Sequence, residues 1–269
     1  MFDSVGIVGL GLIGGSLAKA LRPHTKKLIG VDPRVRAPGL IDAAGPLSEC
    51  ELVVLAAPVE RIPRLIPSIA SQMAPEAVLM DVASVKAPVF DAVLRLKRPV
   101  NFISGHPMAG TEQKGFEHSD AGMFQGRPFL LIPGVLSGKR PIRLAEKMAR
   151  AIGAQPRWLL SPEHHDLALA YVSHAPHVLA YALLASAGSP LKGFYKKNFL
   201  REIAGPSFRD ATRVASSPPG SVASFLLSNR ANILRALADV DGALREFRAV
   251  LKKGSRGILL KLLNRIMKP

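Results

Sequence analysis

The sequence feature that most constrains the fold is the glycine-rich turn Gly9-Leu10-Gly11-Leu12-Ile13-Gly14 near the N-terminus. It directly follows a short apolar stretch that predicts a strand at residues 5–8, and it opens a helical pattern at residues 15–21. In such a turn the first glycine permits a tight bend, the second lets the backbone approach a pyrophosphate, and the third lets helix and strand pack closely. The helix N-terminus then directs backbone N–H groups and the positive end of its dipole at the phosphates. This context predicts a dinucleotide-binding site, with Gly9, Gly11, Leu12, Ile13 and Gly14 in contact with the cofactor.

Asp32, at the end of the next predicted strand, indicates which dinucleotide is bound. A carboxylate at this point accepts hydrogen bonds from the adenosine ribose hydroxyls and repels a 2′-phosphate, so NAD is favoured over NADP. Arg34 and Arg36 leave NADP open, because a nearby arginine can pair with that phosphate; they can also stack on adenine or be exposed loop charges. We assign Arg34 to the cofactor site, together with Ala57 and Pro58, which follow the predicted strand at residues 52–56.

The first 160 residues alternate β-rich stretches with amphipathic helical patterns. Helical patterns lie at residues 59–72, 88–96 and 141–152. The expected strands cover residues 5–8, 27–31, 52–56, 77–81, 101–104, 129–132 and 156–160. This alternation predicts an α/β fold with a Rossmann-type, doubly wound, mostly parallel sheet, and the near-continuous apolar strands fit a sheet covered on both faces.

The pattern changes at Ser161-Pro162-Glu163, which reads as an N-cap, a proline at the first helical position and an acid in the first turn. From there to Pro269 the pattern is helical, with breaks near residues 188–190, 205–206, 218–220 and 254. We therefore expect a dinucleotide-binding domain over residues 1–160 and an all-α domain of roughly four to six helices over residues 161–269. Its apolar helices would expose apolar surface alone, which predicts a homodimer through this domain.

The composition limits the cellular compartment and the kinds of binding partner that we expect for this chain. A single cysteine, Cys50, excludes a disulfide framework and a cysteine metal cluster and fits a reducing cytoplasm. His164 and His165 are adjacent and point apart on a helix, so we expect no metal site. No apolar run reaches the roughly 18 residues of a membrane span. The net charge of +16 favours an anionic partner, but the basic segment 245–268 has an apolar repeat at helical spacing, which favours packing over nucleic-acid binding.

Three further clusters carry candidate chemistry. Ser84 lies in DVASVK and His106 in SGHPMAGTE, each where a predicted strand ends, and doubly wound sheets bind ligands at the carboxyl ends of their strands. The third cluster, SHAPH at residues 173–177, lies inside the first helix of the second domain. Pro176 there leaves the carbonyl of Val172 without its donor, so we expect a kink.

These motifs together carry a family resemblance. GLGLIGGSLA, DVASVK, HPMAG followed by TE, SHAPH and FRDATRVA occur in this order between residues 5 and 229. They resemble the prephenate/arogenate dehydrogenase family of tyrosine biosynthesis; beyond about residue 240 the likeness is only helical pattern. The resemblance implies oxidative decarboxylation of prephenate to 4-hydroxyphenylpyruvate with NAD. Conversion of arogenate to tyrosine, or of both substrates, stays open, and the basic chain favours the more anionic prephenate.

The resemblance also implies roles for individual residues. A neutral imidazole is suited to accept a hydroxyl proton near pH 7, and we assign that role to His106. Ser84 is expected to orient His106 and to touch the substrate hydroxyl or the nicotinamide. The substrate is a dicarboxylate, and Arg213 is the candidate for binding a carboxylate bidentately. His177 would face the same pocket, and Thr111 would add a polar contact.

Each of these assignments has a structural alternative. His174 and His177 could be hydrogen-bonded core histidines, Arg213 could pair only with Asp210, and Ser84 could cap the helix that follows it. Two other functions also stay open. One is a different dehydrogenase with a helical tail, such as a β-hydroxyacid or imine reductase relative. The other is a dinucleotide-binding sensor that binds nucleic acid through its basic C-terminal helices.

Overall fold

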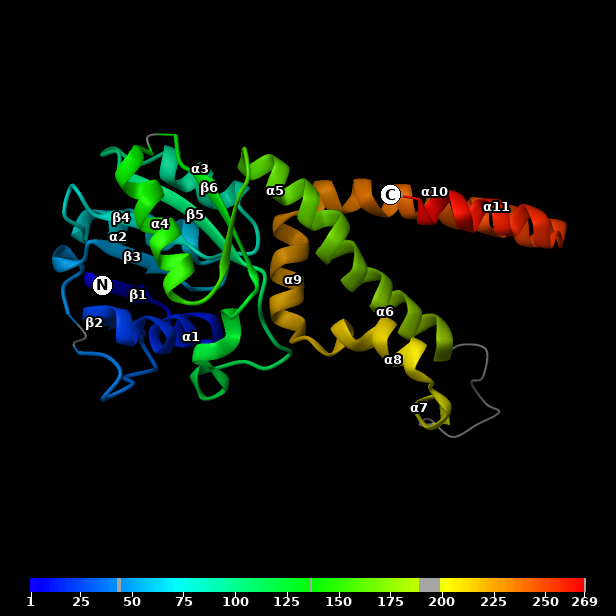
Figure 1. Ribbon diagram of the computed structural model, residues 1–269, viewed down its shortest axis with the longest axis horizontal. Helices are drawn as coiled ribbons and strands as arrows, with labels where there is room; N and C mark the ends of the chain where they lie inside the picture. Colours follow the sequence, from blue (N-terminus) through cyan, green and yellow to red (C-terminus); the bar gives the residue numbers. More distant parts are fainter. Residues whose placement is uncertain (43–44, 136, 189–198, 269) are drawn as a thin grey trace.

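The computed structural model describes residues 1–42, 45–135, 137–188 and 199–268. Its N-terminal part is a sheet with helices on both faces, and its C-terminal part is helical (Figure 1). Strand β7 ends at Trp158 and helix α5 begins at Pro162. Ser161 caps α5, and its side chain accepts a hydrogen bond from the backbone N–H of His164. The change in sequence pattern at residue 161 therefore coincides with the change from sheet to helices.

The sheet contains a strand at every predicted position. Its strands are β1 (Phe2–Val8), β2 (Thr25–Val31), β3 (Leu52–Leu55), β4 (Val78–Asp81), β5 (Asn101–Pro107), β6 (Pro128–Pro133) and β7 (Gln155–Trp158). The order is β2-β1-β3-β4-β5-β6-β7, and neighbouring strands are parallel except β5 and β6. The mostly parallel, doubly wound sheet is confirmed. The strand order reverses between β1 and β3, and such a switch point is where doubly wound sheets bind their ligands.

The antiparallel pair β5–β6 follows from the connection between the two strands. A parallel return needs a crossover, usually a helix, and residues 108–127 contain only short 3-10 turns, at Phe116–His118 and Ala121–Phe124. This connection lies against the helix that follows the glycine turn. Ser16 Oγ accepts from the backbone N–H of Asp120 at 2.9 Å, and Lys19 Nζ donates to the carbonyl of Ser119 at 2.7 Å.

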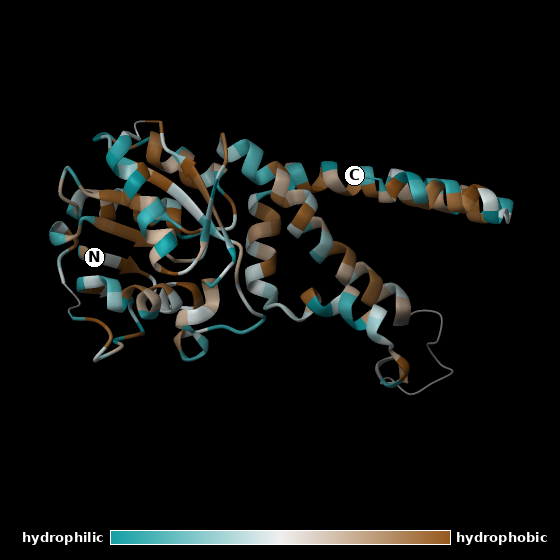
Figure 2. Ribbon diagram, viewed as in Figure 1, coloured by the Kyte–Doolittle hydropathy of each residue, from teal (hydrophilic) through white to brown (hydrophobic). Residues whose placement is uncertain are grey.

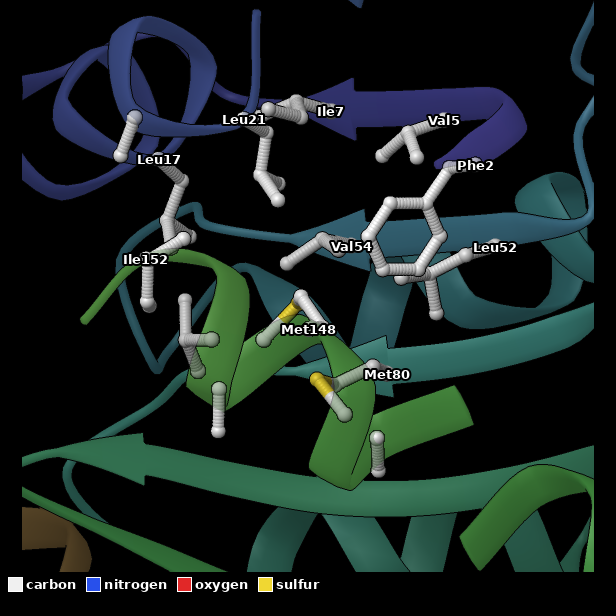
Figure 3. Packing of buried hydrophobic residues seen from close by; sticks show 14 of the residues in the cluster. Phe2, Val5, Ile7, Leu17, Leu21, Leu52, Val54, Met80, Met148 and Ile152 are labelled. Atoms are coloured by element: carbon white, nitrogen blue, oxygen red, sulfur yellow. The ribbon is translucent and has the colours of Figure 1, made fainter. Parts of the chain in front are cut away.

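Two helices cover each face of the sheet. Helices α1 (Leu12–Leu21) and α4 (Lys139–Ala151) pack with β1, β3 and β4 in one apolar cluster, which includes Leu17, Leu21 and Met148 (Figure 3). Helices α2 (Ile62–Gln72) and α3 (Ala87–Leu94) form the other cluster, with Ile66 and Phe90 buried against the opposite face. The central strands β3 and β4 are largely brown in Figure 2 because they consist mostly of apolar residues, and every side chain on them is buried, as in a sheet covered on both faces.

The described chain after residue 160 is helical, as the periodicity predicts. It comprises α5 (Pro162–Leu169), α6 (Ala175–Gly188), α7 (Phe199–Ile203), α8 (Pro206–Thr212), α9 (Pro219–Ser228), α10 (Arg230–Lys253) and α11 (Arg256–Met267). Gly205 and Pro218 precede α8 and α9, and Gly254 ends α10 in the left-handed conformation, with φ of 62°. The predicted break at residues 188–190 lies partly outside the described residues. A kink is expected at Pro176; just before it the structure has a π turn, Ala170–His174, which joins α5 to α6.

Much of the helical part leaves apolar side chains exposed. Helices α10 and α11 extend away from the sheet (Figure 1), and Leu234, Leu251 and Ile266 on them are exposed. Among the described residues, the continuous helix Pro162–Ala187 is long and apolar enough to cross a membrane by length and composition alone, and 28% of its most apolar window is buried. This segment is not an uninterrupted apolar run in the sequence, because histidines, serines and a proline interrupt it without adding charge.

Candidate active site

The glycine turn has the geometry of a pyrophosphate cradle. Gly9 adopts φ of +93°, and a Cβ on Gly14 would lie 1.9 Å from the carbonyl oxygen of Gly9, so neither position accepts a side chain. A Cβ on Gly11, in contrast, would meet no atom within 4 Å. Gly11 is the N-cap of α1, whose first turn has no side-chain cap and no acidic residue. The first N–H groups of the helix, around Leu12 and Ile13, have no partner within the helix, and the turn fits a dinucleotide phosphate.

Asp32 is held rigidly beside this turn. One of its carboxylate oxygens accepts from the N–H of Leu10 at 2.9 Å, and the other accepts from Arg34 at 2.8 Å and Val35 at 3.1 Å. Burial pushes the pKa of Asp32 upward, but these backbone hydrogen bonds outweigh it, so the pKa lies below its ordinary value. The side chain of Arg34 is exposed, and Arg36 donates back to the Asp32 carbonyl at 3.0 Å. A charged carboxylate therefore lies directly beside the glycine turn.

Ala57 and Pro58 follow β3 and lie at the switch point of the sheet. A Cβ on Gly9 would come within 3.0 Å of the Ala57 nitrogen, so the start of this loop lies against the glycine turn. Ala57 is half-buried and Pro58 is exposed. Both are therefore placed beside the residues that can hold the phosphates.

His106 lies near the end of β5, at the same edge of the sheet. Its Nδ1 is 2.9 Å from Nε2 of His165 in α5, and Nδ1 of His165 is 2.8 Å from Oδ1 of Asp166. In the described part of the chain, Nε2 of His106 has no hydrogen-bond partner. Burial, followed by the nearby His165, Lys86 and His174, holds the pKa of His106 well below 6.5. The ring is therefore neutral near pH 7 and can accept a proton.

A buried network of hydrogen bonds and one ion pair lies next to His106. Lys86 Nζ pairs with Asp81 at 2.6 Å and also donates to the carbonyl of Gly105, the residue before His106. The Ser104 hydroxyl donates to the other Asp81 oxygen. Burial lowers the pKa of Lys86, while the Asp81 charge opposes that shift. Each charge of the Lys86–Asp81 pair needs the other, because removing one partner leaves an uncompensated buried charge. Lys86 is therefore held in place, and its hydrogen bond to the Gly105 carbonyl fixes the backbone next to His106.

His165 and Asp166 are site residues that were not predicted from the sequence. The adjacent pair His164 and His165 was considered only as candidate metal ligands. Helical spacing could have found His165, because His165 and Leu169 are four residues apart and both are buried, whereas His164 is exposed. Among the described residues no cluster of His, Cys, Asp and Glu could hold a metal ion.

Ser84 differs from its expected role. It is half-buried and makes no side-chain hydrogen bond within the described residues, and Nδ1 of His106 is oriented by His165 instead. The reason is that α5 packs against α3, which brings His165 within reach of the strand end. Ser84 does not cap α3 either, since the N-cap residue is Lys86 and the described N–H groups of that turn bond to Asp166.

The two histidines of SHAPH occupy different environments. His174 is 2% exposed, stacks on Phe225 and has its Nδ1 3.1 Å from Nδ2 of Asn229, so it is a hydrogen-bonded core histidine. His177 is half-buried; its Nδ1 donates to the carbonyl of Ser173 at 2.9 Å, and its ring meets Phe225 edge-on. Nε2 of His177 therefore keeps its lone pair.

Arg213 begins the 3-10 turn Arg213–Ser216 and reaches back to the sheet domain. Its Nη1 is 2.7 Å from Oε1 of Glu112, rather than paired with Asp210, and 66% of its side chain is exposed. Glu112 follows Thr111 in the loop after β5, the strand that carries His106. The hydrogen bond of Glu112 to its own backbone N–H, and then Arg213, lower the pKa of the Glu112 carboxyl. Thr111 is exposed, and its hydroxyl accepts from the N–H of Gln113.

Comparisons of this sequence with protein-family models and with known proteins agree on one family. Residues 17–156 match the nucleotide-binding domain of prephenate dehydrogenase, and residues 161–265 match the prephenate dehydrogenase dimerization domain. The cyclohexadienyl dehydrogenase of Zymomonas mobilis is 31% identical over 277 residues, covering 97% of this chain and 92% of that protein. The prephenate dehydrogenase of Bacillus subtilis is 32% identical over 250 residues, covering 87% of this chain and 66% of that protein.

Solved structures agree with this result. Prephenate dehydrogenase from Aquifex aeolicus, in complex with hydroxyphenyl propionate and NAD+, superposes with a TM-score of 0.85 at 28% identity, covering 99% of this chain and 96% of that one. Arogenate dehydrogenase from Synechocystis has a TM-score of 0.82 at 27% identity, covering 97% and 96%.

Proposed function

This chain belongs to the prephenate dehydrogenase family and is an NAD-linked oxidoreductase, and we propose that its reaction is the oxidative decarboxylation of prephenate to 4-hydroxyphenylpyruvate. One observation carries the proposal. The parallel strands β1, β3 and β5 end at one edge of the sheet, where they present the glycine turn and the open Nε2 of His106. A hydride acceptor and a neutral base are what oxidation of a ring alcohol requires.

The proposed chemistry assigns one proton to His106. NAD, when bound, supplies the acceptor for the hydride from the ring carbon that bears the hydroxyl. Nε2 of His106 accepts the hydroxyl proton as that hydride leaves. Loss of the ring carboxylate as CO2 then makes the ring aromatic and leaves charge on the same oxygen, to which His106 can return its proton. The low pKa of His106 suits this role, because the ring starts neutral.

The substrate is proposed to bind between the two parts of the chain. Arg213 would bind one carboxylate once it leaves Glu112, and His177 and Thr111 would add polar contacts. Ser84, which has no side-chain hydrogen bond in the described structure, is free to bind the substrate hydroxyl or the nicotinamide. Arogenate carries an amino group in place of the keto group, and Glu112 could pair with that ammonium. We favour prephenate, because the chain carries a net charge of +16 and prephenate is the more anionic substrate.

We further propose that residues 1–160 bind the cofactor and that residues 161–269 complete the substrate site and form a cytoplasmic homodimer. The match to a dimerization domain supports this assignment. So do the exposed side chains Val172, Leu184 and Leu234, which need a cover. On this proposal a second copy, rather than lipid, covers the apolar helix Pro162–Ala187. Sedimentation equilibrium without detergent tests it: a monomer, or a protein that needs detergent to stay in solution, would contradict it.

Steady-state kinetics with prephenate and arogenate, each with NAD and NADP, test the proposed activity. We expect kcat/KM to be highest for prephenate with NAD, and His106→Asn to lower kcat by about 10²–10⁴-fold while the fold is retained. Turnover of arogenate alone would move the assignment to arogenate. Turnover of neither substrate would refute the proposal.

A further inference from the structure

Asp166 is a buried carboxylate in α5 that accepts three hydrogen bonds, and its side chain is 3% exposed. Oδ1 accepts from the backbone N–H of Lys86 at 2.8 Å, and Oδ2 accepts from that of Ala87 at 2.9 Å. These two N–H groups begin α3, which has no cap from its own side chains. Oδ1 also lies 2.8 Å from Nδ1 of His165. One carboxylate of the helical part therefore caps a helix of the sheet part and binds a histidine.

The third of these hydrogen bonds determines where the protons lie on two imidazole rings. A carboxylate can only accept, so Nδ1 of His165 carries the hydrogen. A neutral His165 then has a lone pair on Nε2, which must accept from Nδ1 of His106, 2.9 Å away. His106 consequently carries its hydrogen on Nδ1 and its lone pair on Nε2. This is the nitrogen that the proposed reaction uses.

We propose that Asp166 is a positioning residue for the base: by fixing the tautomer of His165, it keeps the lone pair of His106 on Nε2. This inference rests on the proposed function, in which His106 is the base. Asp166 does not touch the substrate; it acts through His165. Because its two other donors belong to α3, the same carboxylate holds α5 against the sheet domain, and the base is correctly set only while the two parts are packed together.

A helix cap alone does not require a carboxylate at this position. Asparagine or serine caps helices well, but the three donors facing Asp166 leave no place for an N–H or O–H of its own. In Asp166→Asn the amide oxygen can keep the hydrogen bond from Ala87, in the place of Oδ2, and the NH2 group, in the place of Oδ1, then faces both Nδ1 of His165 and the backbone N–H of Lys86. His165 is expected to respond by accepting on Nδ1 and donating from Nε2. His106 must then accept on Nδ1 and carry its hydrogen on Nε2, where it blocks proton transfer.

The experiment compares Asp166→Asn with wild type and with Asp91→Asn, an exposed carboxylate change in α3. We expect Asp166→Asn to lower kcat for prephenate by about 10²–10⁴-fold, while KM for prephenate and NAD changes less than about threefold. Asp91→Asn should match wild type in both parameters. An Asp166→Asn variant with wild-type kcat would overturn the proposal.

The nitrogen shifts of the imidazole rings provide a readout that a purely structural role would not change. ¹⁵N NMR of selectively labelled protein at about pH 7.5 should show His106 with its hydrogen on Nδ1 in wild type and on Nε2 in Asp166→Asn. An unchanged tautomer in a folded variant would refute the inference. This measurement does not depend on turnover, so it separates failure of this inference from failure of the proposed activity.

His165→Gln covers the case in which Asp166→Asn does not fold, because it leaves the cap of α3 in place. We expect it to lower kcat by at least about tenfold, since it removes the ring that orients His106. In the double variant the loss should be close to that of the worse single variant, because both residues act in one chain of hydrogen bonds. Losses that multiply, or an unaffected His165→Gln enzyme, would overturn the proposal.

Discussion

Replacing His174 by glutamine is expected to make the fold less sensitive to acid. His174 is buried, and burial lowers its pKa from 6.5 to about 4, with the nearby Asp166 opposing the shift and His165 and His177 adding to it. Below pH 6.5, His174 therefore binds a proton in the unfolded chain, whereas in the folded chain it stays neutral until near pH 4. The free energy of unfolding consequently decreases as the pH falls from 6.5 to about 4. A shift of about 2.5 units corresponds to roughly 3 kcal/mol at its full extent.

The assay is urea unfolding of wild type and His174→Gln at one fixed protein concentration, because the proposed dimerisation would make stability depend on concentration. At about pH 7.5 wild type should be the more stable protein, since glutamine loses the stacking on Phe225. Between about pH 7.5 and pH 4.5 the difference should shift by roughly 2–3 kcal/mol in favour of the variant. His24→Gln, at an exposed histidine, controls for the loss of a histidine as such. A difference that changes by less than about 0.5 kcal/mol would refute the reasoning.

Three further predictions test the site. Gly14→Ala should lower both Tm and NAD affinity, because its Cβ would lie 1.9 Å from a backbone carbonyl oxygen. Gly11→Ala should keep Tm and weaken only NAD binding, because its Cβ would meet no atom within 4 Å. Melting curves and cofactor titration check both predictions. Glu112→Gln should lower KM for prephenate by freeing Arg213 and raise it for arogenate, and an unchanged ratio of the two KM values would contradict this. The lowered pKa of His106 predicts that kcat/KM stays flat as the pH falls to 6.5; an acid limb that begins above pH 6.5 would count against it as the base.

Local sequence patterns were enough to predict the elements of the fold. Strand β3 is a run of apolar residues buried on both faces, and Ser161 with Pro162 starts a helix where N-cap and N1 preferences require one. The direction of β6 could not be predicted in the same way. It depends on how residues 108–127 fold back over α1, and the two hydrogen bonds that hold them there join residues 104 and 100 apart in the chain.

The sequence by itself determined the glycine turn, the carboxylate beside it and the place of His106 at a strand end, because each depends on neighbours a few residues away. Only the tertiary structure decided what orients His106, since its contact with His165 joins residues 59 apart and the contact of Asp166 with Lys86 joins residues 80 apart. A residue pattern carries no information about which surfaces of two domains will meet. The turn that most constrained the fold explains how a dinucleotide can bind, whereas the docking of α5 on α3 explains how the base is held.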